Sequence, residues 1–282
     1  MTPDPPPAGR TVNPPAFEAA VDDYLAPYRQ QFNHDAMRHT FLDNDRFHRW
    51  AALVDRLHPI RGARFLSSGC GMGGSLLAYH DAGAATVTGV EVDPLYVRLA
   101  GLRVQGVPGA DVHAIDPDQP LPFADGAFDV IESMDVLEHV PDPPAYLAEL
   151  VRVLVPDGTI LLVTPNRLWP VEQHLGIAGP PWLPVGLADR LFTGLSRLPM
   201  LAEDRRFRYA KLHGMRTQNL SLRTLRRLAR DAGLHLRLLQ RDPDDDDFPL
   251  PADHPRAEAL LGHRLGKFLA PVKTLAITLQ RR

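Results

Sequence analysis

Hydrophobic and polar residues follow two periods along the chain, and these predict strands and helices in turn. Short, almost continuous apolar runs of the kind found in buried strands lie at 63–68, 85–91, 110–115, 128–133 and 159–164. Segments with apolar residues at helical spacing separate most of them, at 75–82, 93–105 and 143–154. Because strands and helices alternate through short connections, the pattern predicts an α/β fold with a doubly wound, mostly parallel sheet.

The segments around this alternating core have different patterns. Residues 3–15 are rich in proline and predict a mobile tail, whereas apolar spacing over 16–58 predicts a helical arm. Residues 167–216 interrupt the alternation and predict an inserted lid. After it come a helix at 221–233 and two more strands, at 234–240 and at the C-terminal 274–280. The expected division is a tail (1–15), an arm (16–58), a first core part (59–166), a lid (167–216) and a second core part (217–282).

Composition and charge exclude several classes of protein. Of 282 residues, 44% are hydrophobic and 23% are charged, as in a folded globular protein. The formal net charge is −3, which gives no reason to expect a nucleic acid partner. A single cysteine excludes a disulfide framework, and no apolar run approaches the ~20 residues of a transmembrane helix. The N-terminal sequence lacks the layout of a signal peptide, so a cytoplasmic location is expected; the oligomeric state stays open.

A glycine-rich segment follows the first predicted strand and opens a helix. It reads Ser67-Ser68-Gly69-Cys70-Gly71-Met72-Gly73-Gly74. Glycines there allow positive φ and let backbone amides approach a ligand, which in such sheets binds beyond the carboxyl ends of the strands. One set of these glycines fits the dinucleotide pattern and another fits a tighter one, so the segment alone does not decide between ligands.

Two acidic residues stand at the ends of the next two predicted strands. Glu91 ends the second strand, twenty residues after Gly71, where a carboxylate can accept both ribose hydroxyls of an adenosine-type ligand. Asp116 ends the third strand, where it could accept from an adenine amino group; the other interpretation is a turn aspartate before Pro117.

With these motifs the chain resembles the class I S-adenosylmethionine-dependent methyltransferases over about residues 45–166. The resemblance lies in FLSSGCGMGG, GVEVDP, IDPDQPLPFADGAFDVIESMDVLEHVPDP and LVPDGTILLVTPN, in that order. It implies a Rossmann-like, seven-stranded sheet whose last strand is antiparallel and inserted beside the fifth. It also implies S-adenosylmethionine as cofactor, methionine contacts from the loop glycines, adenine packing on the residue after Glu91 and a cofactor border after the fourth strand. The positions assigned in this way are Ser67, Gly69, Gly71, Gly73, Glu91, Val92, Ile115, Asp116 and Ser133.

Two features depart from the family pattern. The family usually carries an acid where Ser67 stands, and that acid helps to hold the amino group of the cofactor. We therefore expect weaker cofactor affinity or a substitute acid nearby. The spacing from Asp116 to Leu121-Pro122-Phe123 is also about one residue longer than usual.

Methyl transfer needs alignment of the reacting atoms, and it needs a base only if the nucleophile keeps its proton. The candidate bases are His139, after the fourth strand, and Glu172 and His174, in the lid. Each also has a purely structural interpretation. Candidate substrate contacts are Trp169, Tyr209 and His213. The apolar lid residues could line a pocket for a small, partly apolar molecule, form the core of the lid or touch a membrane surface.

Three other functions compete with this one. An NAD(P)-dependent oxidoreductase or epimerase would share the sheet, the glycine loop and Glu91. A nucleic-acid methyltransferase is disfavoured, since the position after the fourth strand reads Glu132-Ser133-Met134-Asp135 and lysine is scarce. A non-catalytic adaptor with the same fold is the third. We expect no catalytic metal, and we interpret the aspartate run 242–247 as a flexible charged loop.

Overall fold

The computed structural model describes residues 10–29, 34–172, 174–213, 220–242, 245–251 and 274–281, without the side chains of 239–251. Two compact units make up the chain. The first is Met1–Ser133 with Arg152–Ile160, and the second is Met134–Val151 with Leu161–Arg282. In the described residues, no helix combines the length and the apolar character that crossing a membrane would require.

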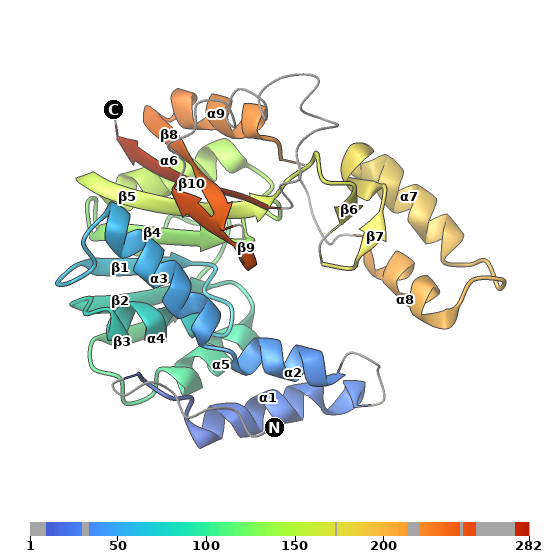
Figure 1. The fold of residues 1–282 in the computed structure, drawn as a ribbon, viewed down its shortest axis with the longest axis horizontal. Helices are drawn as coiled ribbons and strands as arrows, with labels where there is room; N and C mark the ends of the chain where they lie inside the picture. The colour runs from blue at the N-terminus through green and yellow to red at the C-terminus, as the bar shows by residue number, and fades with distance from the viewer. Residues whose placement is uncertain are drawn as a thin grey trace. The chain divides into compact units, whose positions relative to one another are not determined.

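The main sheet has the strand order β3-β2-β1-β4-β5-β10-β8-β9 in the part of the chain that is described (Figure 1). The strand β1 pairs in parallel with β2 and β4, and β2 pairs in parallel with β3. Near the C-terminus, β10 is antiparallel to β8 and stands between β5 and β8. This confirms the predicted doubly wound sheet with its last strand antiparallel and inserted beside the fifth. The bounds are β1 Arg64–Ser68, β2 Thr86–Glu91, β3 Ala110–Ala114, β4 Phe128–Met134, β5 Leu154–Pro165, β8 Leu234–Asp242, β9 Asp245–Pro251 and β10 Thr274–Arg281.

Apolar side chains build the core of the first unit. In β1, Phe65 and Leu66 are fully buried, and Val87 and Val90 of β2 are buried beside them. Asp93 caps the next helix as predicted, because its carboxylate accepts from the amide of Leu95 at 2.8 Å. The helices of this unit are α1 Pro15–Leu25, the 3-10 turn η1 Ala26–Tyr28, α2 His34–Leu42, α3 Asp45–Leu57, α4 Gly74–Asp81 and α5 Pro94–Arg103.

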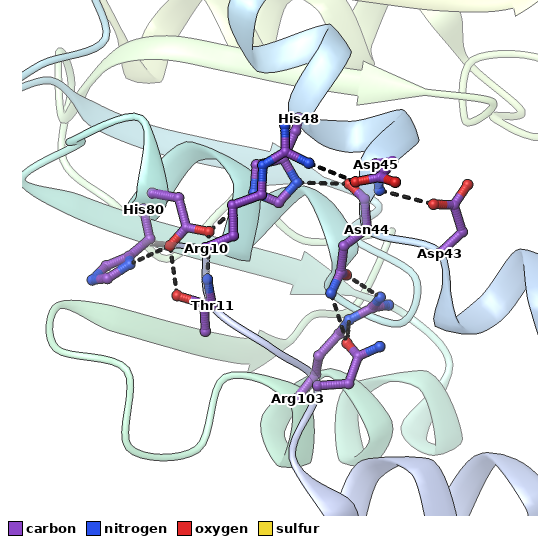
Figure 2. Close-up of polar contacts among 10 residues, drawn as sticks. Arg10, Thr11, Asp43, Asn44, Asp45, His48, His80 and Arg103 are labelled. Atoms are coloured by element: carbon purple, nitrogen blue, oxygen red, sulfur yellow. Dashed lines mark hydrogen bonds and ion pairs between the residues drawn. The ribbon is translucent and has the colours of Figure 1, made fainter. Parts of the chain in front are cut away.

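The N-terminal segment corrects the prediction of a mobile tail over 1–15. Residues 1–9 lie outside the described part, but the segment from Arg10 to Asn13 is held by side chains of the first unit (Figure 2). Thr11 donates its hydroxyl and its amide to Asp81 of α4. Proline content misled the prediction because Pro15 is the first residue of α1, where a missing N–H costs nothing.

A buried arginine fixes the same segment to the core. The guanidinium of Arg103 donates to Asn13 Oδ1 at 3.0 Å and to Asn44 Oδ1 at 2.6 Å (Figure 2). It also donates to the carbonyl of Met72 at 3.3 Å and lies over the ring of Phe17. The helical arm therefore packs directly against the glycine loop, and Met72 shares a core cluster with α1.

The second unit contains most of α6 Pro143–Val153, the end of β5, the antiparallel strands and the inserted lid. The segment predicted to be a lid, called the lid below, comprises β6 Val171–Glu172, β7 Ile177–Ala178, the 3-10 turn η2 Pro180–Trp182, α7 Val185–Leu195 and α8 Glu203–Lys211 (Figure 1). It has a core of its own around Ile177, Ala188, Phe192 and Leu212. Ser221 caps α9 Leu222–Asp231 by accepting from the amide of Thr224, as its sequence predicts.

Two local predictions are wrong. The strand predicted at 159–164 begins earlier, since residues 156–158 already lie within β5, where Gly158 packs so closely on the carbonyl of Asp129 that a side chain would not fit. The aspartate run expected to be a loop supplies the end of β8 and the start of β9. Aspartate and proline are depleted in strands, but the edge of a sheet tolerates them, and β9 is at the edge. Residues 243–244 and the side chains of this run lie outside the description.

Candidate functional site

The glycine loop of the first unit depends on left-handed backbone at three positions. Gly69, Gly71 and Gly73 have φ values of 77°, 51° and 76°. A side chain at Gly73 would press on Ala100, at 3.1 Å from its Cβ, so this glycine serves close packing against α5. At Gly71, by contrast, a Cβ would meet nothing within 4 Å. The loop therefore leaves open space at Gly71, where its backbone can approach a ligand.

Glu91 turns toward this loop and not toward solvent. Its Oε2 accepts from the amide of Gly71 at 2.9 Å, and its Oε1 accepts from the amides of Val92 and Asp93 at 2.8 and 3.2 Å. The residue is 8% exposed. Each carboxylate oxygen has two lone pairs, and the amides of Val92 and Asp93 occupy both on Oε1. Oε2 holds the loop through Gly71 and can still accept one hydroxyl group of a ligand.

The remaining predicted cofactor positions lie at or just beyond the carboxyl ends of β1, β2, β3 and β4. Val92 is 53% exposed, which leaves an apolar surface beside Glu91 on which a flat ring could pack. Ile115 donates its amide to the carbonyl of Glu91 at 3.0 Å, which holds the end of β3 next to Glu91. Asp116 is exposed and accepts from the amide of Asp118 at 3.0 Å, so its side chain shapes a local turn. Ser67 and Ser133 are both buried.

The single cysteine is a packing residue of the loop. Cys70 is buried, and a Cβ on Gly89 would lie only 2.8 Å from its sulfur. Burial, followed by the negative charges of Glu91 and Glu132, raises the pKa of the Cys70 thiol to about 12. The thiol is therefore protonated at neutral pH and is a poor nucleophile.

In the second unit, the lid places two of the candidate bases, Glu172 and His174, against each other. Nδ1 of His174 lies 2.7 Å from Glu172 Oε1. Glu172 is 3% exposed and also accepts from the amides of His174 and Leu175 at 3.1 and 2.8 Å. Its position is fixed by backbone donors, so Glu172 orients the imidazole of His174.

A second carboxylate stands between the two histidines. Glu138 Oε1 lies 3.7 Å from Nε2 of His139 and 3.8 Å from Nε2 of His174. The two imidazole rings are 5.3 Å apart in an edge-on arrangement. Thr164 donates its hydroxyl to the other oxygen of Glu138 at 3.0 Å.

The charges in this cluster shift each other's ionisation. The hydrogen bond to Glu172 is the largest cause that raises the pKa of His174, and it outweighs burial. The same pairing lowers the pKa of Glu172 although burial opposes it. Burial and the nearby charge of Asp135 raise the pKa of Glu138. Perturbed groups gathered in this way are typical of sites that move protons.

Glu138, His139 and His174 also place one ligand atom each within 4.8 Å of one another, a spacing that could hold a metal ion. The sequence did not suggest this grouping because His174 comes from the lid. Asp135 precedes the cluster with a φ of 53°, a strained backbone for a non-glycine residue. Neither Glu138 nor Asp135 was singled out from the sequence. For Asp135 the reason is that no sequence pattern encodes its positive φ.

The predicted substrate contacts are separate from this cluster. Tyr209 packs edge-on against Phe192 in the lid core, with ring centroids 5.0 Å apart. His213 is exposed and pairs with Asp189 at 3.2 Å. Trp169 is half-buried, and its amide donates to Asn166. Among the described residues, none of these three has a hydrogen bond, ion pair or ring contact to the histidines. Trp182, Leu187 and Leu191 leave an exposed apolar face on the lid.

The sheet order, the glycine loop and the strand-end carboxylate define a Rossmann-like protein that binds a nucleoside-type ligand. Comparison with known proteins identifies its family. The sequence model of the family described as "Methyltransferase domain" matches residues 42–239, so the chain belongs to this family. The cofactor of such enzymes is S-adenosylmethionine.

The curated relatives cover part of the chain. An uncharacterized methyltransferase of Mycobacterium tuberculosis is 37% identical over 122 residues, 43% of this chain and 47% of that protein. A ubiquinone biosynthesis O-methyltransferase of Thiobacillus denitrificans is 34% identical over 121 residues, 42% of this chain and 50% of that protein. A 2-methyl-6-phytyl-1,4-hydroquinone methyltransferase of Synechocystis is 34% identical over 121 residues, 42% of this chain and 36% of that protein. The chain thus spans about half the length of the first curated relatives it matches.

Solved structures agree on the fold. The crystal structure of an S-adenosylmethionine-dependent methyltransferase from Mesorhizobium loti has a TM-score of 0.55 at 18% identity. The match covers 85% of this chain and 100% of that one. At this identity the likeness shows the fold alone.

Proposed function

We propose that this protein is an S-adenosylmethionine-dependent methyltransferase that methylates a hydroxyl oxygen of a small, partly apolar molecule. The observation that carries the proposal is the bond between Glu91 and the amide of Gly71, beside the open space at Gly71. The residues fit the cofactor because an exposed Val92 adjoins this carboxylate. When bound, S-adenosylmethionine supplies an electrophilic methyl group on a sulfonium. The protein aligns the acceptor, and such alignment can contribute ~7–11 kcal/mol.

The acceptor is proposed to be a phenol or hydroquinone carrying an apolar group. Relatives named for ubiquinone biosynthesis O-methylation and for a phytyl hydroquinone support this class of acceptor. The exposed apolar lid face of Trp182, Leu187 and Leu191 supports it too, because an apolar substituent would gain from leaving water there. A cytoplasmic location and a small-molecule partner remain parts of the proposal.

A hydroxyl acceptor calls for a base, and His174 is the proposed one. Glu172 would hold the Nδ1 proton of His174, which leaves Nε2 to take the proton of the acceptor. Glu138 Oε1 lies 3.8 Å from Nε2, and its negative charge would stabilise the resulting imidazolium. General base catalysis of this kind typically contributes a factor of ~10²–10⁴.

The base assignment is tested by the pH dependence of kcat/KM with catechol and hydroquinone acceptors. His174 must be neutral to act, so activity should rise as the pH passes its raised pKa. Glu172→Gln removes the main cause of that raised pKa, so the acid limb should move to lower pH. His113→Asn, at a half-exposed histidine paired with Asp111 in β3, is the matched control. An unmoved acid limb in Glu172→Gln would refute the role of this pair.

The same assay decides whether the cluster acts through a metal ion. The proposal expects activity to survive dialysis against a chelator. Loss of activity that added divalent cation restores would instead assign Glu138, His139 and His174 to a metal site.

A further inference from the structure

A completely enclosed carboxylate lies beside the glycine loop in the first unit. Glu132 of β4 is 2% exposed and stands directly opposite Ser67 in the register of β1 and β4. Ser67 donates its hydroxyl to Glu132 Oε1 at a long 3.4 Å, and Ser75 donates to Ser67 at 3.2 Å. The ring of Tyr79 in α4 is fully buried on the same side.

This carboxylate has no charged partner in the described part of the chain. Its second oxygen, Oε2, and the hydroxyl of Tyr79 are both buried without a well-formed hydrogen bond, although the hydroxyl lies close enough to the carboxylate to lower its pKa. Burying an ionised carboxylate without an opposite charge is strongly unfavourable, so such a group is rare unless a ligand supplies the charge.

The ionisation of Glu132 reflects the same imbalance. Burial raises its pKa to about 7, although the hydroxyls of Ser75, Tyr79 and Ser67 and the more distant cation of Arg46 all lower it. Its charge also contributes to the raised pKa of Cys70, which places the carboxylate close to the loop itself. The group is thus balanced between its neutral and charged forms beside the cofactor loop.

We propose that Glu132 provides the negative charge that receives the cationic methionine end of the cofactor, in place of an acid at Ser67. S-adenosylmethionine carries an ammonium group and a sulfonium, and a nearby anion stabilises such cations where water is excluded. Ser67 and Glu132 are paired positions on the neighbouring strands β1 and β4. The proposed carboxylate therefore stands one strand away from the position where the family usually carries its acid, and the small serine leaves room for it. This inference rests on the proposed function, because it assumes that the loop binds this cofactor.

The first test compares two ligands by calorimetry in the full-length protein and in Glu132→Gln. S-adenosylhomocysteine has the ammonium group, whereas 5′-methylthioadenosine has the adenosine part without it. Glu132→Gln should weaken binding of S-adenosylhomocysteine about 10- to 100-fold and leave 5′-methylthioadenosine unchanged. Equal weakening of both ligands, or of neither, would overturn the inference. Failure of the unmodified protein to bind either ligand would instead refute the proposed function.

Stability and protonation separate a ligand-binding role from a structural one. Replacing an unpaired buried charge should keep or raise the thermal midpoint of Glu132→Gln, so a folding defect cannot explain its lower affinity. Near pH 6, binding of S-adenosylhomocysteine should release a proton as Glu132 ionises against the ammonium group, and Glu132→Gln should abolish that release. A proton release that survives in Glu132→Gln would contradict the proposal.

A double variant that moves the carboxylate from Glu132 to position 67 gives the sharpest test. Adding Ser67→Asp to Glu132→Gln returns a carboxylate to the paired position on β1. The double variant should regain affinity for S-adenosylhomocysteine relative to Glu132→Gln. If it binds as weakly as the single variant, the charge does not act from this strand pair, and the inference is wrong.

Discussion

Arg103 offers the strongest test of how the N-terminal arm supports the glycine loop. Its guanidinium is 1% exposed and donates to Oδ1 of Asn44 (Figure 2). It also donates to Oδ1 of Asn13 and to the carbonyl of Met72. Burial lowers the pKa of Arg103 to about 10, so holding the charge in place itself costs free energy. The bonds that it makes must offset this cost.

Replacement by methionine keeps much of the volume and removes every donor. A buried acceptor left without its donor costs ~1–3 kcal/mol. The buried carbonyl of Met72 and the part-buried Oδ1 of Asn44 lose the Arg103 donor, whereas Asn13 Oδ1 keeps the side-chain amide of Asn44 as a donor at 3.2 Å. The desolvation of the guanidinium is relieved at the same time, so the net loss for Arg103→Met should be about 2–4 kcal/mol. For a chain of this length that corresponds to a fall of roughly 5–10 °C in the thermal midpoint.

Differential scanning calorimetry measures this change directly. Arg98→Met is the matched control, because Arg98 is exposed on the same helix α5. An equal shift of the midpoint in both variants would refute this role of Arg103. Asn13→Ala should reproduce part of the Arg103 effect, and an unchanged midpoint in that variant would show that the N-terminal segment adds no stability.

Three further outcomes follow from described contacts. Gly73→Ala should lower stability, since a Cβ presses on Ala100, whereas Gly71→Ala should mainly weaken binding of S-adenosylhomocysteine; the reverse pattern would contradict the loop assignment. Burial would raise the pKa of Asp81, but hydrogen bonds from Thr11 and His48 to its carboxylate outweigh burial and lower the pKa. The ionised Asp81 therefore stabilises the folded protein above the pKa of the unfolded state, and this stabilisation is lost on acidification. Denaturant titrations should therefore show a shallower fall in unfolding free energy between about pH 5 and 2 for Asp81→Asn. Cys70 should resist alkylation by iodoacetamide at pH 7.5 until the protein unfolds, and rapid labelling of the native protein would refute its buried role.

The alternating core could be predicted because its signals are local. Strand runs such as 63–68 and 128–133 are continuously apolar, and caps such as Asp93 stand immediately before their helices. The position of β10 beside β5 followed from the family resemblance. The loop glycines and Glu91 are close in space because consecutive parallel strands end at the same edge.

Other features depend on contacts between distant residues, and no local pattern encodes them. The binding of Thr11 to Asp81 spans 70 positions, so proline content alone predicted a free tail. The partnership of Glu132 with Ser67 depends on strand register, which the sequence does not state. The grouping of Glu138 with His174 likewise required the folded lid. The expectation of a substitute acid near Ser67 named no residue, whereas the strand register places Glu132 opposite Ser67.

The central claim is that the glycine loop and Glu91 together hold S-adenosylmethionine. Isothermal titration of the purified protein with S-adenosylhomocysteine, NADH and NADPH tests it most directly. We predict saturable binding of S-adenosylhomocysteine and no binding of either dinucleotide. Glu91→Ala should lower the affinity for S-adenosylhomocysteine about 10- to 100-fold. Asp111→Ala, on the exposed edge of β3, should leave that affinity unchanged. Binding of a dinucleotide without S-adenosylhomocysteine, or equal affinity in Glu91→Ala and the unmodified protein, would contradict it.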